Sequence, residues 1–477
     1  FGDLFIWFES EHGPEEQAVF LRFDPTSLKL KERLEGNPEV IFAQSQAKMT
    51  MERFITQFHA DLHLGKLGLV LTGLLGLTLM ASIVSGLIIH RKILKELFTF
   101  RPFRSLRLML TDTHKVLSVW GLLFHSMIGF TGAFLGLSTI LLLPAAALVS
   151  FQGDQEELLQ TFQPERMPTL SGEPSPMAVS QVLSHSKSLA DVTRSITIMG
   201  WGDKNALAFV STYNSEGTDE SRDMGVQTHT YRLSSGKHSD TTTAFEMVGG
   251  LSGPILDTMF PLHFGSFGGL TVRIIWGLLG LSTALVAASG MMIWVERRAY
   301  GAEGKLSPEN YLRLSKLTIG SCSGMVLACV SLFWLQRLAP DYILEGFFSI
   351  WLVGISLAFS LKNNHQSNRL LLGLSGVILT AVPFVDAATL EHHLFNSATG
   401  THNHLATIDI TLMLCGVLML YIVHKLPRTR QEEQHKKSKE NKEHKERSSV
   451  ADEPLHDQPQ TTDVFVGQSL TPAEDPL

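Results

Sequence analysis

Residues 59 to 90 read HADLHLGKLGLVLTGLLGLTLMASIVSGLIIH, an apolar run punctuated by glycines with a histidine at each end. About 20 apolar residues in a helix cross the hydrocarbon core of a bilayer, so this run is long enough to span a membrane. The run returns 204 positions later without a gap. The matched positions are His59 with His263, Gly65 with Gly269, residues 73–77 with 277–281, and Ser85-Gly86 with Ser289-Gly290. Repetition at a fixed period indicates a duplicated scaffold, and it makes His59 and His263 candidate functional residues.

Apolar residues gather in blocks of this length along the chain. Of the 477 residues, 44% are hydrophobic and 18% are charged, and the mean hydropathy is positive. These features predict a mainly α, polytopic membrane helical bundle with internal duplication. The net charge of -7 is accompanied by no basic, aromatic-interleaved stretch, so we expect no nucleic-acid partner.

Seven apolar runs of spanning length are visible. They lie near 66–90, 116–143, 270–295, 315–336, 343–361, 369–389 and 405–424. Seven Lys or Arg residues against two acidic ones lie between positions 91 and 115, so the positive-inside rule makes this loop cytoplasmic. The later loops keep the alternation, which predicts a multi-pass membrane protein with its C-terminus in the cytoplasm.

The polar stretches between these runs predict soluble parts. A helical patch at 176–190 is followed by strand-like pieces at 194–199, 206–212 and 226–233, which predicts an α+β domain on the outer side of the membrane. The predicted parts are a remnant of a first outer domain (1–58), transmembrane helices of a core bundle (59–149), the outer α+β domain (150–258), a further core helix (259–300), four C-terminal transmembrane helices (301–424) and a disordered cytoplasmic tail (425–477).

The second copy of the repeat runs helix, soluble domain, helix. The first copy shows only a soluble remnant and a helix. The duplication therefore predicts that the opening helix of the first copy, and much of its soluble domain, lie upstream of Phe1.

Two further histidines, His114 and His125, belong to the second predicted span. They are 11 residues apart, which at ~100° per residue is within about 20° of three full turns and ~16 Å along the axis. Both therefore project from one face of the helix. Imidazole is a common axial ligand of haem iron, and helix bundles hold cofactors between facing helices, so this pattern favours haem.

Other interpretations of these residues stay open. His125 could hydrogen-bond a Ser or Thr of a neighbouring helix, and His114 could lie at the membrane interface. The glycines around them fit ordinary small-residue helix packing equally well. A second His-rich stretch, 391–404, offers metal-ligand types without any defined zinc spacing. The alternative interpretation of this stretch is an exposed polar loop that binds no metal.

Several enzyme signatures are missing. The sequence contains no phosphate-binding Gly loop with Lys, no Gly-x-Ser-x-Gly and no His-Glu-x-x-His. Hydrolases and nucleotide-driven pumps are disfavoured accordingly. The three cysteines, Cys322, Cys329 and Cys415, lie inside apolar runs, where we expect them to pack as small apolar side chains.

Three motifs, in order, resemble the PepSY-associated transmembrane proteins, bacterial inner-membrane proteins often described as iron-regulated. The resemblance covers roughly 55 to 300. The residues that carry it are Phe58-His59, Leu64-Gly65, Gly68 and Ser85-Gly86, then Asp112-Thr113-His114-Lys115, Trp120-Gly121 and Thr131-Gly132, and then Pro261-Leu262-His263-Phe264-Gly265 with Gly268-Gly269. The stretch 150–258 lies where this family has a periplasmic PepSY-type domain.

The resemblance implies a b-type haem protein that carries electrons across the inner membrane. In some members the acceptor is a periplasmic ferric siderophore. The implied haem-binding residues are His59, His114 and His263, with His125 as an addition, and the staggered depths of the histidines suit two haems. The implied partners are the lipid bilayer, haem, a ferric siderophore and a cytoplasmic or quinol electron donor.

Two other functions stay open at this point. A metal or siderophore permease would use the His-rich stretch 391–404 and the later helices, and would need no redox cofactor. A membrane anchor whose periplasmic domain binds another protein would not need the histidines at all.

Overall fold

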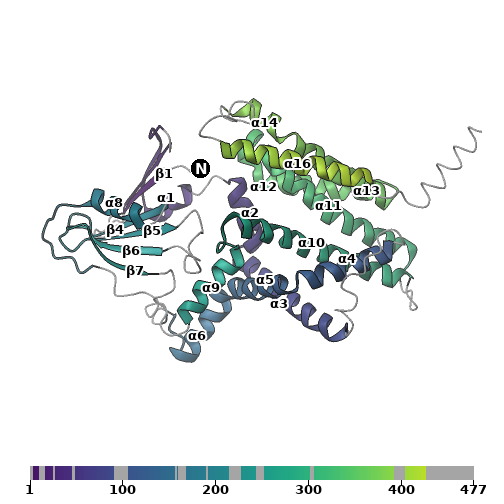
Figure 1. Ribbon diagram of the computed structural model, residues 1–477, viewed down its shortest axis with the longest axis horizontal. Helices are drawn as coiled ribbons and strands as arrows, with labels where there is room; N and C mark the ends of the chain where they lie inside the picture. The colour runs from purple at the N-terminus through teal and green to yellow at the C-terminus, as the bar shows by residue number, and fades with distance from the viewer. Residues whose placement is uncertain are drawn as a thin grey trace, which may run out of the picture. The chain divides into compact units, whose positions relative to one another are not determined.

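The computed structural model describes residues 4–9, 17–24, 27–45, 49–90, 106–155, 158, 168–189, 192–213, 227–242, 252–300, 306–390 and 403–425. Helices dominate, and two small antiparallel sheets accompany them (Figure 1). The described residues up to Tyr421 belong to one compact unit, Phe1–Tyr421.

Six helical segments among the described residues are long and apolar enough to cross a membrane, and a bent helix pair makes a seventh. The membrane-spanning class expected from the sequence is thereby confirmed. The straight helices are α3 (Lys66–Ile89), α10 (Gly269–Tyr300), α11 (Pro308–Leu338), α12 (Ile343–Ser360) and α16 (Asn403–Lys425), and one further span combines α13 (Asn364–Thr380) with α14 (Val382–Thr389).

The second span departs from the sequence expectation. A continuous helix over 116–143 was expected, but α4 (Leu106–Trp120) and α5 (Leu122–Leu137) meet at Gly121 with a bend of 74°. A Cβ on Gly121 would lie 2.5 Å from Cε1 of His125, so only glycine leaves room for that ring. A five-residue π-helical turn, Ser138–Leu142, and α6 (Leu143–Ser150) follow α5. The expectation that His114 and His125 share one face of one straight helix is therefore wrong, because the axis turns between them.

Helices α3 and α5 pack backbone against backbone through glycines. A Cβ on Gly76 would lie 2.7 Å from the backbone nitrogen of Ala133, and one on Gly136 would lie 2.8 Å from Cα of Gly73. Small residues allow this approach, which replaces the hydrophobic driving force that lipid does not provide. This packing fixes the bent α4–α5 pair against the first repeat helix.

The N-terminal residues form a three-stranded antiparallel sheet in the order β1-β2-β3. Its small core consists of Ala18, Phe20 and Ile41, with Ile41 contributed by a short helix. The strands are β1 (Leu4–Glu9), β2 (Ala18–Phe23) and β3 (Leu30–Gly36), and the helix is α1 (Pro38–Ser45).

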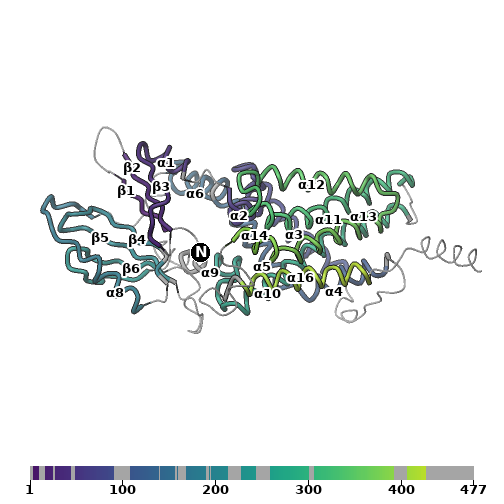
Figure 2. The backbone as a smooth tube through the Cα atoms, turned by 90° about the horizontal axis from the view of Figure 1, so that it is seen from above, coloured from purple at the N-terminus to yellow at the C-terminus, as the bar shows by residue number. Residues whose placement is uncertain are grey.

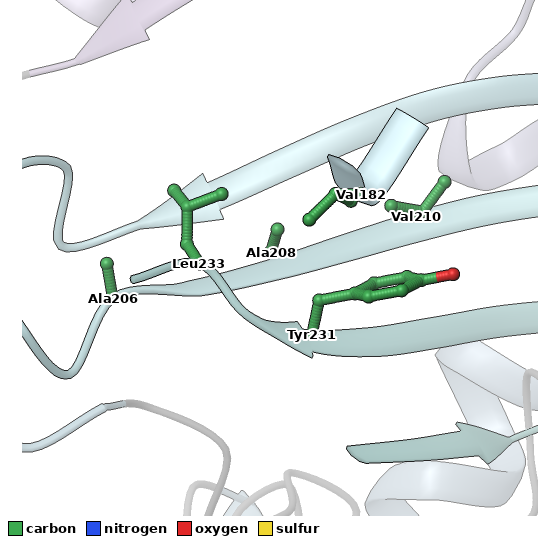
Figure 3. Packing of buried hydrophobic residues seen from close by; sticks show 6 residues of the cluster. All are labelled: Val182, Ala206, Ala208, Val210, Tyr231 and Leu233. Atoms are coloured by element: carbon green, nitrogen blue, oxygen red, sulfur yellow. The ribbon is translucent and has the colours of Figure 1, made fainter. Parts of the chain in front are cut away.

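The insert forms a four-stranded meander, β4-β5-β6-β7, with helix α8 on one face. Alternate residues along β5 and β6 and just beyond them pack against α8, and Figure 3 shows Val210, Tyr231 and Leu233 around Val182 of the helix. Strand β7 was not expected from the sequence, because its polar run KHSDTT carries no apolar alternation. The elements are α8 (Val179–Leu189), β4 (Val192–Met199), β5 (Leu207–Tyr213), β6 (Gln227–Arg232) and β7 (Lys237–Thr242).

The duplication is visible in the order of elements. Strands β5, β6 and β7 precede helix α9 (Ser252–Phe264) and the span α10, just as β1, β2 and β3 precede helix α2 (Met51–Asp61) and the span α3. His59 lies in α2 and His263 lies in α9. Both histidines thus belong to short helices that lead into the spans, whereas the sequence had placed them at the outer ends of the spans themselves.

Helices α11, α12 and α13 run side by side (Figures 1 and 2). Their contacts again use glycines: a Cβ on Gly354 would lie 2.8 Å from Cα of Gly324. The ammonium of Lys316 is nearly buried and donates to the carbonyl oxygens of Phe359 (3.0 Å) and Leu361 (2.6 Å) at the end of α12. Carbonyl groups at a helix C-terminus stabilise a cation, which explains how this charge is accommodated.

The repeat supplies a matched test of the α3–α5 contact. Gly76→Val should lower the thermal stability of the detergent-solubilised protein, because overpacking a tight contact costs roughly 1–3 kcal/mol. The control is Gly280→Val, the equivalent position of the second repeat, where a Cβ meets nothing within 4 Å. Thermal unfolding followed by intrinsic fluorescence measures both, and equal losses in the two variants would contradict the packing described.

Candidate functional site

Helices α2 and α9 bring His59 and His263 together. Their imidazole rings lie 6.0 Å apart between centroids, at 46° to each other. The two residues are 204 positions apart and equivalent in the repeat, so the site joins the two copies. Local backbone turns end both helices here: Leu62 after α2 has φ 55°, and Gly265 after α9 has φ 66°.

A hydrogen bond between His263 and Thr131 orients the His263 ring. The Thr131 hydroxyl donates to the carbonyl oxygen of Met127 at 2.8 Å. With that bond kept, the Thr131 oxygen accepts from Nδ1 of His263, 2.9 Å away. In this tautomer of the neutral ring, Nε2 of His263 carries the lone pair that a metal-binding imidazole requires.

His114 is held in the same way at the other end of α10. Its Nδ1 atom lies 2.9 Å from the carbonyl oxygen of Val286 and 3.3 Å from the hydroxyl of Ser289. A carbonyl only accepts, so Nδ1 carries the proton and Nε2 carries the lone pair. A Cβ on Gly290 would lie 3.1 Å from Cε1 of His114, so this glycine gives the ring its room. The Ser-Gly pair of the repeat thus has a function in seating His114.

His125 is buried between α5 and α10 in the opposite protonation state. The hydroxyl of Ser282 donates to the carbonyl oxygen of Leu279 at 2.7 Å and so accepts from Nε2 of His125, 3.1 Å away. A hydrogen bond to a Ser or Thr of a neighbouring helix was one of the interpretations left open by the sequence. The structure shows that bond, and it occupies the nitrogen that most often binds haem iron.

The four candidate histidines thus fall into three places. His59 and His263 lie together, whereas His114 and His125 contact α10 separately. The sequence did not single out their partners, Thr131, Ser282 and Val286. Thr131 alone had a sequence signal, through its place in a family motif. The other partners had none, because helix packing decides which hydroxyl or carbonyl lies beside a histidine.

A second histidine cluster, which the sequence analysis missed, lies in the insert. The rings of His185 and His229 flank that of His238, with centroids 5.6 and 5.8 Å from it. His229 is 3% exposed, and its two nitrogens lie 2.9 Å from the hydroxyl of Thr212 and 2.8 Å from that of Thr241. Burial lowers the pKa of His229, and the charges of His238 and His185 lower it further.

The geometry of these residues does not form a metal site of protein ligands alone. Among the described residues, no group of three or more His, Cys, Asp or Glu side chains is placed to hold a metal ion. The His-rich stretch proposed as a metal site lies, from 391 to 402, outside the described residues.

The fold and the site define a multi-pass membrane protein with a duplicated core and hydrogen-bonded histidines between its helices. The chain belongs to the family of PepSY-associated transmembrane proteins: the family model described as the PepSY-associated TM region matches residues 6–297. An uncharacterized protein of Pseudomonas aeruginosa, PA4219, is 28% identical over 398 residues, which cover 77% of this chain and 92% of that protein. The family expected from the sequence is confirmed.

The histidine cluster makes the stability of the insert depend on pH. The folded pKa of His229 lies below its ordinary value of about 6.5. As the pH falls below that ordinary value, the unfolded domain binds the proton first, so the free energy of unfolding decreases until the folded pKa is reached. The protection of residues 227–242 against hydrogen exchange, measured relative to the intrinsic amide exchange rate at each pH, should fall between about pH 7 and pH 5.

His229→Gln should flatten that pH dependence, while His90→Gln, at the exposed end of α3, should leave it unchanged. A pH dependence of equal size in His229→Gln and the unsubstituted protein would contradict this assignment.

Proposed function

We propose that the protein is a haem-b-containing electron-transfer protein of the bacterial inner membrane, acting as a transmembrane reductase of periplasmic ferric siderophore or ferric iron. The observation that carries the proposal is the pair His59 and His263 at the junction of the two repeats, with Nε2 of His263 left free by Thr131.

The residues present fit haem. A metal-binding histidine almost always donates its other ring nitrogen to a carbonyl, carboxylate or similar acceptor, which orients the ring and strengthens its basicity. His263 and His114 both do so, through Thr131 and Val286. His59 and His263 would hold one haem between the repeats, and His114 would contribute to a second. His125 fits less well, because its Nε2 donates to Ser282.

The spacing of these residues along α10 supports two haems at different depths. His263 precedes the first residue of α10, Gly269, and His114 contacts Val286, 17 residues further on. At 1.5 Å per residue this is about 25 Å, most of the thickness of a hydrocarbon core. The positive-inside rule assigns the His59–His263 end to the periplasm and the C-terminus to the cytoplasm.

When bound, haem supplies a one-electron Fe(III)/Fe(II) couple. The chain's own residues determine where that couple is held. Thr131 and Val286 orient the imidazoles of His263 and His114, and the apolar faces of α3, α5 and α10 exclude water. Each electron from a cytoplasmic or quinol donor would reduce one Fe(III) of the acceptor to Fe(II) at the periplasmic end.

A difference spectrum tests this function. The purified protein, produced in cells supplied with haem, should show reduced-minus-oxidised Soret and α-band changes. His263→Ala and His114→Ala should each lose part of the haem, counted as pyridine haemochrome, because each removes a proposed ligand. His90→Ala is the control, since His90 lies at the exposed end of α3 and should keep the full content.

Two results would overturn the proposal. A colourless preparation from haem-replete cells would remove the redox function. Full haem content in both His263→Ala and His114→Ala would remove these residues as ligands. Uptake of metal or siderophore by proteoliposomes of a colourless protein would instead establish a permease.

A further inference from the structure

Helix α2, which carries His59, packs against the C-terminal helices α11 and α12. Phe54 of α2 is fully buried among Ala328 and Leu332 of α11 and Ile343 and Phe347 of α12. These C-terminal helices lie beyond residue 297, where the match to the family model ends. The contact therefore links a candidate ligand of the family core to an additional part of this chain.

Aromatic rings form most of the contact. The ring of Phe347 lies 4.6 Å from that of Phe54 and 5.2 Å from that of Phe58, between centroids. Phe58 is the residue directly before His59. Aromatic pairs at these distances contribute specific orientation in addition to the apolar area they bury.

Two hydrogen bonds fix the position of α2 along the contact. The backbone N–H of Met51, in the first turn, donates to Oε1 of Gln336 on α11 at 2.7 Å. At the other end, Nε2 of His63 donates to the carbonyl oxygen of Phe54 at 3.1 Å, and its ring lies 4.6 Å from that of Phe54. The first turn of α2 is thus bonded to α11, and the chain that follows α2 returns to place His63 against Phe54 of the same helix.

The buried face of α2 and the position of His59 differ. At ~100° per residue, His59 is about 140° around the helix from Phe54. Phe54 faces α11 and α12, and the ring of His59 faces His263. Any shift of Phe54 therefore moves His59 as part of one rigid helix.

The second copy anchors its histidine differently. The indole of Trp276 donates to the carbonyl oxygen of Leu262, next to His263, at 2.9 Å, and packs against Phe124 and Phe267. The equivalent of Trp276 in the first copy is Thr72, whose hydroxyl bonds the carbonyl oxygen of Ala60 at 2.7 Å. Threonine thus bonds the carbonyl of the residue after its histidine, whereas Trp276 bonds that of the residue before. Threonine lacks the aromatic packing, and the C-terminal helices supply the packing instead.

We propose that α11 and α12 act as a clamp that positions His59 opposite His263, with Phe54, Phe58 and Phe347 as positioning residues. The consequence for haem rests on the proposed function, whereas the positioning of His59 does not. This assigns a role to helices outside the family core: they replace, from a distant part of the sequence, the tryptophan that the second copy carries within its own span.

Cross-linking measures the position of residue 59 without any cofactor. In the full chain, with Cys322, Cys329 and Cys415 changed to Ala, His59→Cys and His263→Cys are joined by a short bifunctional thiol reagent in membranes. Phe347→Ala should cause a several-fold loss of this cross-link, and Phe347→Leu should restore most of it. Phe359→Ala, at an exposed position of the same helix, is the matched control and should change nothing.

A reference pair reports whether the core remains folded. His125→Cys and Ser282→Cys replace side chains in hydrogen-bond contact between α5 and α10, away from the clamp. This cross-link should persist in Phe347→Ala. If that variant loses both cross-links, a second variant, Gln336→Leu, tests the clamp. It removes only the acceptor of the Met51 N–H and should reduce the 59–263 cross-link alone.

The clamp is overturned if the 59–263 cross-link is unchanged in Phe347→Ala. It is also overturned if Phe347→Ala loses both cross-links and Gln336→Leu has no effect on the 59–263 cross-link. In the haem-loaded protein with its native histidines, Phe347→Ala should also shift the midpoint potential and the low-spin signature, while Phe359→Ala should not. A lost cross-link in a protein that never binds haem supports the clamp and refutes the proposed function. An unchanged cross-link in a protein that binds haem refutes the clamp and supports the proposed function.

Discussion

An imidazole inside a bilayer has lost its water, and a hydrogen bond from a neighbouring helix must take its place. In this protein the replacement comes from hydroxyl groups that have already donated their proton to their own helix, or from a backbone carbonyl. Thr131 and Ser282 can only accept, and so can the carbonyl of Val286. Each of three histidines is therefore oriented, with one chosen ring nitrogen as the hydrogen-bond donor. The chemistry that the site can perform depends on that choice.

The same constraint separates the histidines by role. His263 and His114 donate through Nδ1 and leave Nε2 free, whereas His125 donates through Nε2. Three residues of one type, in adjoining helices, thus use different ring nitrogens for their hydrogen bonds. His125 ties α5 to α10 through Nε2, near the point where α4 and α5 bend around Gly121, and the other two use Nδ1.

The two copies of the repeat have diverged in how they pack. Gly73 and Gly76 of α3 allow close contact with α5, while their equivalents in α10, Gly277 and Gly280, have no neighbour at the position of a Cβ. A duplicated sequence thus does not impose a duplicated environment. The second copy uses α10 to seat His114 and His125, and the first copy uses the C-terminal helices to hold α2. Because of this difference between the copies, residues 308–360 form part of the packing around the helix that carries His59.

The sequence by itself determined the membrane class, the spans and the duplication, because long apolar runs have few alternatives in a bilayer and a repeat of 204 positions is read without knowledge of contacts. It also selected His59 and His263, whose equivalence follows from that repeat. The tertiary structure alone decided the bend at Gly121, the burial of Phe54 against Phe347 and the proton position on each imidazole. These features depend on which helices are neighbours. The sequence does not distinguish a glycine at a helix kink from a glycine at a close helix contact.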